Sequence, residues 1–339
     1  MLDLFPSADI GPFGRRVRSA RGARIPVTVV TGFLGAGKTT LVKHFLAQSE
    51  GRGTAVVVNE FGAVGIDDAL LRASADETVL LSNGCLCCAF RSDLQVALRR
   101  LVSERDSGRA PGFGRIVIET SGLADPSPIL ATFTTDRALG GEFHVEAVIA
   151  VVDAVNGAGT LDWSAEARRQ VMLADRVVVT KRDLAPADAA DRLESRLRAL
   201  NPLAEIVAAA NGRIDPRLLT DPAPDGARSG FAAEATHSDD VQSFVLTEEQ
   251  PITWAPFARA METLVALRGA DLLRVKGLLN VEGCRGPVVV QFVQHLAHPP
   301  AELAAWPDAG RQSRLVFITR GLAESAVRGL LDATRQVAG

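Results

Sequence analysis

The fold is decided by the stretch Thr31-Gly32-Phe33-Leu34-Gly35-Ala36-Gly37-Lys38-Thr39-Thr40. An apolar run from residue 25 to residue 30 precedes it and predicts a buried strand, and a helical pattern of apolar residues follows it from Leu41. A strand, a glycine-rich turn and a helix in this order form the setting that a phosphate-binding loop requires. The spacing Gly-x4-Gly-Lys-Thr of such a loop is present as well.

Each residue type in this loop has a physical reason. Gly32, Gly35 and Gly37 let backbone N–H groups curl around an anion without Cβ clashes. Lys38 has the length to reach the β- and γ-phosphates, and the Thr39 hydroxyl is a ligand for Mg²⁺. The predicted nucleotide contacts from this stretch are Gly35, Ala36, Gly37, Lys38, Thr39 and Thr40.

The composition of the 339 residues, 47% hydrophobic and 23% charged, is typical of a soluble globular protein with one large or two medium domains. A net charge of −3 gives no reason to expect nucleic acid as a partner, and no apolar run is long enough to cross a membrane. Residues 1–24 are rich in arginine and lack the apolar segment of a signal peptide. We expect a flexible basic arm there, with a docking segment as the alternative, and a cytoplasmic protein.

Three cysteines, Cys85, Cys87 and Cys88, lie within four residues after a short predicted strand at 78–81. Thiolates are soft ligands that favour Zn²⁺, Cu⁺ or similar ions, and a helix expected from about Arg91 favours the thiolate form. Packing of three small hydrophobic side chains is the alternative. A closed tetrahedral site needs a fourth ligand, which the sequence does not identify. Crowded thiols also fit a reducing compartment.

Acidic residues follow two further predicted strands. The apolar strand 115–119 ends in Glu119, the place of a Walker B acid that holds Mg²⁺ directly or through water. Gly122 follows and can offer its N–H to the γ-phosphate. Another predicted strand runs into a polar loop with Glu60 and Asp67, which we interpret either as metal-facing acids or as solvated loop acids.

A fourth motif, Thr180-Lys181-Arg182-Asp183, follows the predicted strand 176–179 and is similar to the Asn-Lys-x-Asp loop that reads guanine. Asp183 is expected to accept the guanine N1 and N2 hydrogens, and Lys181 to stack its stem on the base. Thr180 replaces the usual asparagine, and because its hydroxyl is shorter we expect weaker affinity for the base.

Composition divides the chain into domains. Proline and glycine become frequent between residues 211 and 239, and we interpret this segment as a linker. Residues 25–210 predict an α/β domain, a P-loop NTPase fold with a mostly parallel sheet flanked by helices, in which one helix covers Trp163 to Ala174. Residues 240–339 show the order strand, helix, three strands, helix, which is typical of a small α+β module.

Taken in order, these motifs resemble the CobW family of GTPases, also called the CobW/nitrile hydratase activator group. The Cys-x-Cys-Cys loop between the two Walker motifs is specific to that family, and the end of the chain looks like its C-terminal domain. The resemblance is carried by Gly32 to Thr40, Asn59-Glu60-Phe61-Gly62, Gly84-Cys85-Leu86-Cys87-Cys88, Glu119 to Pro126 and Thr180 to Asp183.

The resemblance implies a carrier that depends on GTP and Mg²⁺, binds Zn²⁺ or Co²⁺ through the three cysteines, and delivers the metal to a client apo-metalloprotein. A homodimer that depends on the bound nucleotide is compatible with it. Lys38 then holds the phosphates, Thr39 and Glu119 hold Mg²⁺, and Glu60 or Glu119 is the candidate for orienting the attacking water.

Two features depart from the family pattern. Many members carry a histidine-rich tract in the linker, whereas only His237 lies there, which argues against metal storage but not against transfer. Residues 1–24 contain no cysteine, so the docking motif for methionine aminopeptidase is not supported. Two other functions stay open: a GTP-dependent metal sensor without transfer, and a small-molecule kinase, against which the base-reading loop argues.

Overall fold

The computed structural model describes residues 24–59, 80–82, 90–186, 188–209, 213–221, 241–306 and 310–338. The chain forms two compact units, an N-terminal unit of Arg24–Leu200 and Ala204–Ala223 and a C-terminal unit made mainly of Pro224–Gly339. The predicted basic arm, apart from Arg24, and most of the predicted linker lie outside the described residues. The domain limits therefore stay predictions there.

The N-terminal unit is built on a seven-stranded sheet in the order β3-β2-β4-β1-β5-β6-β7, in which all neighbouring strands run parallel. β1 and β5 are buried along most of their length, because helices cover both faces of the sheet. The predicted α/β fold is confirmed. The strands are β1 (Ile25–Thr31), β2 (Thr54–Asn59), β3 (Leu80–Ser82), β4 (Arg115–Thr120), β5 (Phe143–Asp153), β6 (Arg176–Thr180) and β7 (Glu205–Ala208).

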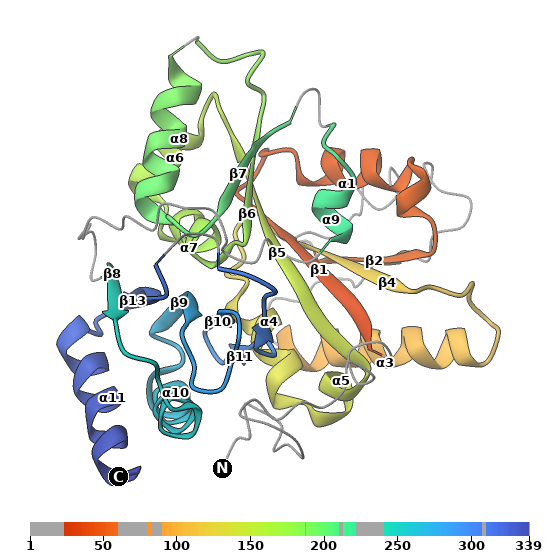
Figure 1. Ribbon diagram of the computed structural model, residues 1–339. Helices are drawn as coiled ribbons and strands as arrows, with labels where there is room; N and C mark the ends of the chain where they lie inside the picture. Colours follow the sequence, from red (N-terminus) through yellow and green to blue (C-terminus); the bar gives the residue numbers. More distant parts are fainter. Residues whose placement is uncertain are drawn as a thin grey trace. The chain divides into compact units, whose positions relative to one another are not determined.

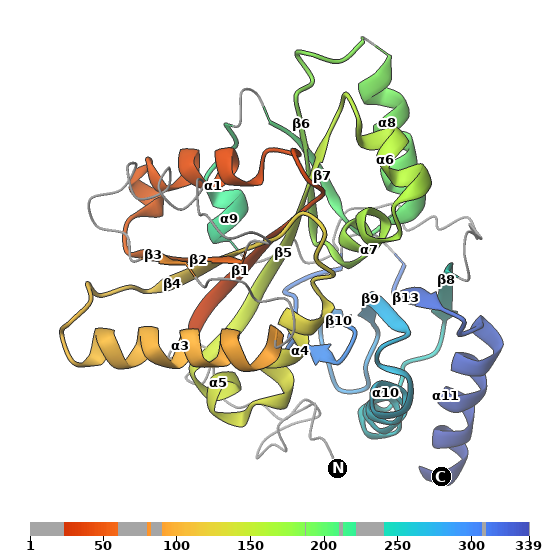
Figure 2. The same ribbon diagram turned by 180° about the vertical axis from the view of Figure 1, so that it is seen from behind.

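Helices cover the sheet on two sides, with α1 and α9 on one face and α3, α4 and α5 on the other (Figures 1 and 2). Val151 of β5 packs with α1 and its neighbour Val152 packs with α6, α7 and α8, because successive strand residues point to opposite faces. The helices are α1 (Lys38–Leu46), the 3-10 turn η2 (Ser49–Gly51), α3 (Phe90–Asp106), α4 (Ser127–Thr135), α5 (Arg137–Glu142), α6 (Gly157–Trp163), α7 (Ala165–Leu173), α8 (Ala189–Leu200) and α9 (Arg217–Thr220).

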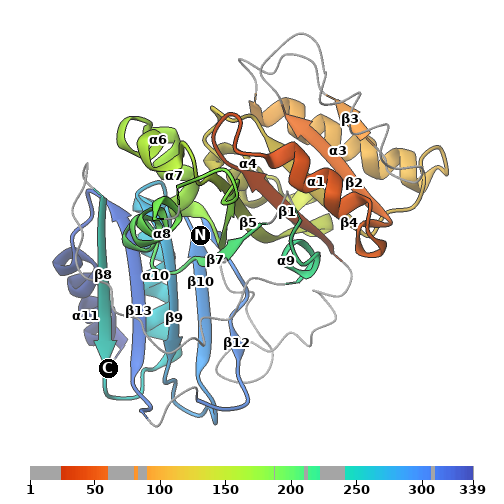
Figure 3. The same ribbon diagram turned by 90° about the horizontal axis from the view of Figure 1, so that it is seen from above.

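The C-terminal unit is an antiparallel sheet in the order β11-β10-β9-β13-β8, with β12 paired to β10. Figure 3 shows β8, β13, β9 and β10 side by side, with α10 and α11 behind them. Phe257, Met261 and Leu264 of α10 join the core, as their helical spacing predicts. The elements are β8 (Val241–Glu248), α10 (Trp254–Arg268), β9 (Leu272–Leu279), β10 (Val288–Val293), β11 (Leu296–Ala297), β12 (Ala301–Glu302), β13 (Ser313–Arg320) and α11 (Glu324–Ala338).

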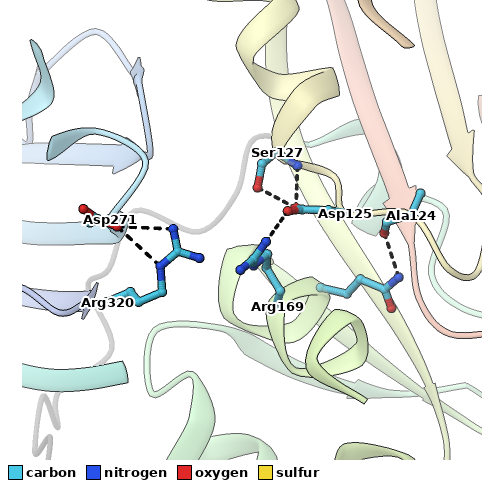
Figure 4. Close-up of polar contacts among 7 residues, drawn as sticks. Ala124, Asp125, Ser127, Arg169, Asp271 and Arg320 are labelled. Carbon is cyan, nitrogen blue, oxygen red and sulfur yellow. Dashed lines mark hydrogen bonds and ion pairs between the residues drawn. The ribbon is translucent and has the colours of Figure 1, made fainter. Parts of the chain in front are cut away.

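An ion pair lies at the end of β13 within this unit. The Arg320 guanidinium donates to Asp271 Oδ1 at 3.2 and 3.3 Å (Figure 4). Burial disfavours ionisation of Asp271, but its hydrogen bonds from Arg268 and Arg320 outweigh that cost and hold the pKa of the carboxyl below its ordinary value. Both partners are partly exposed, so the pair contributes little to stability.

The helix predicted over Trp163–Ala174 is wrong at its start. Trp163 ends α6, and a new helix, α7, begins at Ala165. The break lies at Ser164, whose extended backbone and hydroxyl, which accepts from the Ala167 N–H, form the N-cap of α7. Periodicity alone cannot find such a break, because both helices present apolar residues to the same core.

The predicted linker begins too early. Residues 213–221 contain α9 and are packed onto the N-terminal unit. The Leu219 carbonyl accepts from the Thr28 hydroxyl at 2.8 Å, the Thr220 carbonyl accepts from Arg115 at 2.7 Å, and the Leu218 carbonyl accepts from Arg176 at 2.8 Å. Proline-rich composition predicts a break in regular structure, but it says nothing about such long-range contacts.

The first prediction tests this packing. Leu219 is fully buried in the core beneath β1, so Leu219→Ala is expected to lower the free energy of unfolding of the N-terminal unit by about 2–5 kcal/mol. Denaturant unfolding followed by tryptophan fluorescence measures the change. Arg217→Ala, at an exposed position of the same helix, is the control, with an expected change under about 0.5 kcal/mol. If the two variants were equally stable, residues 213–221 would instead be part of the linker.

Candidate functional site

The phosphate loop joins the end of β1 to the start of α1 through glycines in left-handed conformations. Gly35 has φ 71° and Gly37 has φ 99°, and a Cβ on Gly32 would lie 2.2 Å from the Val151 carbonyl oxygen. Gly37 is the N-cap of α1, and no side chain caps this helix start. The first amides of α1 are therefore available to an anion, as the loop motif predicts.

Lys38 folds back over the loop. Its ammonium donates to the Gly32 carbonyl at 2.9 Å and to the Phe33 carbonyl at 3.2 Å, and the side chain is buried. The positive charge is thus held inside the loop, where a bound phosphate would exchange with these two acceptors. The loop and the first turn of α1 bring together the predicted phosphate contacts Gly35, Ala36, Gly37, Lys38, Thr39 and Thr40.

Glu119 reaches the loop from the neighbouring strand. β4 pairs with β1 in a register that sets Glu119 opposite Val30, one residue before β1 ends. The Thr39 hydroxyl donates to Glu119 Oε1 at 2.6 Å, and Glu119 is only 2% exposed. A hydroxyl and a carboxylate are oxygen ligands of the kind that Mg²⁺ prefers, so this pair fits the predicted Mg²⁺ site.

Gly122 lies directly against the phosphate loop. A Cβ at this position would be 2.6 Å from the Leu34 backbone nitrogen and 2.8 Å from the Leu34 Cα. Any larger residue would therefore push the chain after β4 away from the loop. The role of the Gly122 N–H at the γ-phosphate stays a prediction.

The base-reading loop is tied to the phosphate loop through Thr180. Its hydroxyl donates to the Ala36 carbonyl at 2.7 Å, so the residue that replaces asparagine connects two loops of the site. Lys181 has a left-handed backbone, with φ 55°, and its ammonium lies 3.0 Å from Asp153 Oδ2. Asp183 is exposed and therefore accessible to a nucleotide base.

Sequence reasoning missed Asp153, which ends β5 beside this loop. Its carboxylate accepts from the N–H groups of Val155 and Asn156 at 2.8 and 2.7 Å, and from the Lys181 ammonium. Burial disfavours its ionisation, but the hydrogen bonds from Asn156 and Lys181 together outweigh burial and hold the pKa of the carboxyl below its ordinary value. The available signal was an acid at the end of a long buried strand, the same signal that identified Glu119.

Several predicted site residues lie outside the described residues: Glu60, Asp67, Cys85, Cys87 and Cys88. Within the described part of the chain, no group of three or more His, Cys, Asp or Glu side chains is arranged to hold a metal ion. The described helices include none that is long and apolar enough to cross a membrane.

The chain matches two known domain families. The nucleotide-binding domain described as CobW/HypB/UreG matches residues 26–208, and the cobalamin synthesis protein cobW C-terminal domain matches residues 241–335. The chain belongs to the CobW family. The resemblance drawn from the motifs is confirmed, and so is the expectation that the end of the chain is a CobW C-terminal domain.

Characterised relatives of the family match nearly the whole chain. Zinc chaperone YjiA of Escherichia coli K12 is 35% identical over 325 residues, 92% of this chain and 99% of that protein. Zinc chaperone CobW of Pseudomonas aeruginosa is 33% identical over 358 residues, 91% of each chain. The crystal structure of Zn(II)-bound YjiA GTPase from E. coli matches with a TM-score of 0.69 and 32% identity, over 92% of this chain and 99% of that one. These matches confirm the prediction of a P-loop GTPase of the CobW family.

The second prediction concerns the Asp153–Lys181 pair. Asp153→Asn keeps an oxygen for the two backbone N–H groups but loses the charge partner of Lys181. At pH 7 we expect a loss of about 1.5 kcal/mol in the free energy of unfolding, at the lower end for charged hydrogen bonds because Lys181 is partly exposed. Unfolding of wild type and variant is measured from pH 7 to pH 3.

The contribution of Asp153 to stability should depend on pH in one direction. Because the folded pKa of Asp153 is lowered, its contribution is complete above the unfolded pKa of about 3.9 and is lost as the pH falls through the folded pKa. The difference between wild type and Asp153→Asn should therefore shrink below about pH 4. Asp183→Asn, at an exposed position, is the control, with an expected change under about 0.5 kcal/mol at pH 7. A difference that stays constant down to pH 3 would contradict this role.

Proposed function

We propose that this protein is a GTP-hydrolysing metal carrier that binds zinc or cobalt at Cys85, Cys87 and Cys88 and delivers it to a client apo-metalloprotein. The observation that carries the proposal is the 2.6 Å contact of the Thr39 hydroxyl with Glu119, which joins the phosphate loop and the Walker B acid in one site. The names of the E. coli and P. aeruginosa relatives, both zinc chaperones, support the metal-carrying part.

GTP hydrolysis at this site consists mainly of positioning and charge stabilisation. The open amides at the start of α1 bind the phosphates, and the Lys38 ammonium leaves its two carbonyl acceptors for the γ-phosphate. Gly122 offers its N–H to the same phosphate. Thr39 and Glu119 would hold Mg²⁺, which would supply positive charge next to the phosphate oxygens.

Two further groups complete the nucleotide site. Asp183 reads the guanine N1 and N2 hydrogens, and Lys181, held by Asp153, lies along the base. Glu60 and Glu119 are the candidates for orienting the attacking water. Because Glu119 already accepts from Thr39, Glu60 is the better candidate of the two.

The cysteine loop leaves the sheet at the edge that carries Glu119. β3 ends at Ser82, three residues before Cys85. Ser82 pairs with Val58 of β2, and Val58 pairs on its other side with Glu119. Adjacent strands lie about 4.8 Å apart, so the chain enters the cysteine loop roughly 10 Å from Glu119. This proximity supports a coupling between the bound nucleotide and metal affinity.

Apolar side chains around the phosphate loop support a homodimer that forms when GTP is bound. Leu34, Leu123 and Trp163 are 57%, 48% and 69% exposed. Trp163 contacts Phe33 edge-to-face at 5.3 Å, and Gly122 next to Leu123 contacts Leu34, so the side chains belong to one surface. Apolar surface of this kind favours association. The crowded thiols fit a reducing compartment, which favours the cytoplasm.

The third prediction concerns base choice. Wild type should prefer GTP to ATP, because the Asp183 carboxylate accepts two hydrogens that adenine does not present. Asp183→Asn is expected to weaken GTP binding roughly 10- to 100-fold, as for the loss of a charged hydrogen bond, and to change ATP binding little. Competition against a fluorescent guanine nucleotide measures both. Asp188→Asn, an exposed acid before α8 that pairs with Arg192, is the control. Equal affinity of wild type for the two nucleotides would exclude this role.

The fourth prediction concerns coupling between nucleotide and metal. Zn²⁺ is titrated into the reduced protein with a non-hydrolysable GTP analogue, with GDP and without nucleotide. We expect the affinity for Zn²⁺ to differ between the GTP and GDP states by about 5- to 150-fold, the usual range of such coupling. Because linkage is reciprocal, Zn²⁺ should change the affinity for the GTP analogue by the same factor.

Variants separate the metal site from the nucleotide site. Cys87→Ser and Cys88→Ser should lose both Zn²⁺ affinity and the coupling while they keep GTP binding. Cys284→Ser removes the remaining cysteine, which lies in the C-terminal unit, and should change neither. Equal Zn²⁺ affinity in all three nucleotide states would remove the carrier mechanism and leave a GTPase with an incidental zinc site.

A further inference from the structure

Two consecutive residues of α7, Arg169 and Gln170, donate hydrogen bonds to the loop that follows β4. The Gln170 side-chain amide donates to the Gly122 carbonyl at 3.2 Å and to the Ala124 carbonyl at 3.0 Å. The neighbouring Arg169 guanidinium donates to Asp125 Oδ2 at 2.5 Å (Figure 4). Helix α7 thus contacts three of the four residues that follow Ser121.

Gln170 is a buried polar side chain whose role is not explained by its size alone. It is 1% exposed, and its Oε1 has no hydrogen-bond partner among the described residues. Because both partners of Nε2 are carbonyl oxygens, which only accept, the amide cannot be turned around. A buried acceptor without a partner is destabilising, and an apolar side chain of the same size would avoid that cost. What the glutamine provides in return is a fixed position for two carbonyls of the loop.

These two carbonyls belong to the segment that packs against the phosphate loop. Gly122 lies between the Leu34 backbone on one side and the Gln170 amide on the other. Asp125, the residue that Arg169 binds, also accepts from the backbone N–H of Ser127 at 2.9 Å and so fixes the start of α4. The loop is therefore bonded to α7 at Gly122 and at Asp125, and its Gly122 end lies close to the phosphate loop.

A cavity of about 240 Å³ lies beside Gln170. It is lined by residues of the phosphate loop, by Asp153 and Lys181, and by Gln170 and Val171 of α7. The cavity therefore belongs to the nucleotide site described above. The hydrogen bonds from Gln170 connect the loop after β4 to the helix that borders this site.

We propose that Gln170 is a positioning residue for GTP hydrolysis, which holds the Gly122 segment against the phosphate loop, and that Arg169 supports it through Asp125. The inference rests on the proposed function, in which the Gly122 N–H contacts the γ-phosphate. Without the amide, the Gly122 and Ala124 carbonyls lose their hydrogen bonds to α7, and the Gly122 N–H is no longer held in place for the γ-phosphate. GDP has no γ-phosphate, so its binding does not depend on Gln170.

The fifth prediction follows. Gln170→Leu keeps the size of the side chain and removes the donor, so kcat for GTP should fall about 10- to 100-fold, as for a misplacement of about 1 Å. KM for GTP and the affinity for GDP should stay within about threefold of wild type, because the other phosphate contacts remain. Arg168→Gln is the control, since Arg168 contacts the Leu161 carbonyl of α6 rather than the loop. Steady-state hydrolysis by the full chain with Mg²⁺, and binding of a fluorescent GDP, give these values.

A pH profile separates positioning from a merely structural role. The carboxyl that Gln170→Glu introduces can donate a hydrogen bond to the loop only when it is protonated, and burial raises its pKa. The kcat of Gln170→Glu relative to wild type should therefore rise as the pH falls from 8 to 5.5, whereas that of Gln170→Leu relative to wild type should stay flat. Arg169→Met, at a partly exposed position, should lower kcat less than Gln170→Leu does.

The outcomes are distinguishable. Wild-type hydrolysis together with an unchanged kcat in Gln170→Leu and in Arg169→Met would overturn the inference alone. A parallel loss of kcat, GDP affinity and thermal stability in Gln170→Leu, with a flat relative profile for Gln170→Glu, would also overturn it and assign the residue to folding. Absence of GTP hydrolysis by wild type would overturn the proposed function and the inference with it.

Discussion

The pairing of β1 with β4 is the contact on which the site depends. Their parallel register sets Glu119 opposite Val30 and brings its carboxylate within 2.6 Å of the Thr39 hydroxyl. A shift of one residue would turn Glu119 to the other face of the sheet and separate it from the phosphate loop. The loops after β5 and β6 leave the sheet at the same carboxyl edge, because β5 pairs in parallel with β1 and β6 pairs in parallel with β5.

Two side-chain contacts connect the loop after β6 to the phosphate loop and to the end of β5. Thr180 donates to the Ala36 carbonyl at 2.7 Å, so its short hydroxyl suits a contact between backbone segments rather than a contact with a base. Asp153, from the neighbouring strand, binds the ammonium of Lys181, whose backbone is left-handed. The loop after β6 is thus connected both to the phosphate loop and to the end of β5.

Local pattern sufficed for the parts of the site that carry their own signal. The glycines of the phosphate loop and the acid that ends β4 are informative without knowledge of their neighbours. Gln170 was not identified, because its partners lie 46 to 48 residues away and a glutamine in a helix has no pattern of its own. Asp153 carried the same local signal as Glu119, but its contact with Lys181, 28 residues away, is not visible in any local pattern. The same limit explains α9, whose proline-rich surroundings resemble a linker although its carbonyls accept from Arg115 and Arg176.

The packing of residues 213–221 also sets an order of events during synthesis. Thr28, Arg115 and Arg176, which donate to this segment, are made before it, Thr28 by 191 residues. A nascent chain folds from its N-terminal part onward, so the parallel sheet can form while these donors still face solvent. The N-terminal unit is sealed only after residue 221 has left the ribosome. Slow translation just before this segment would prolong the exposure of an unfinished sheet to chaperones and to other nascent chains.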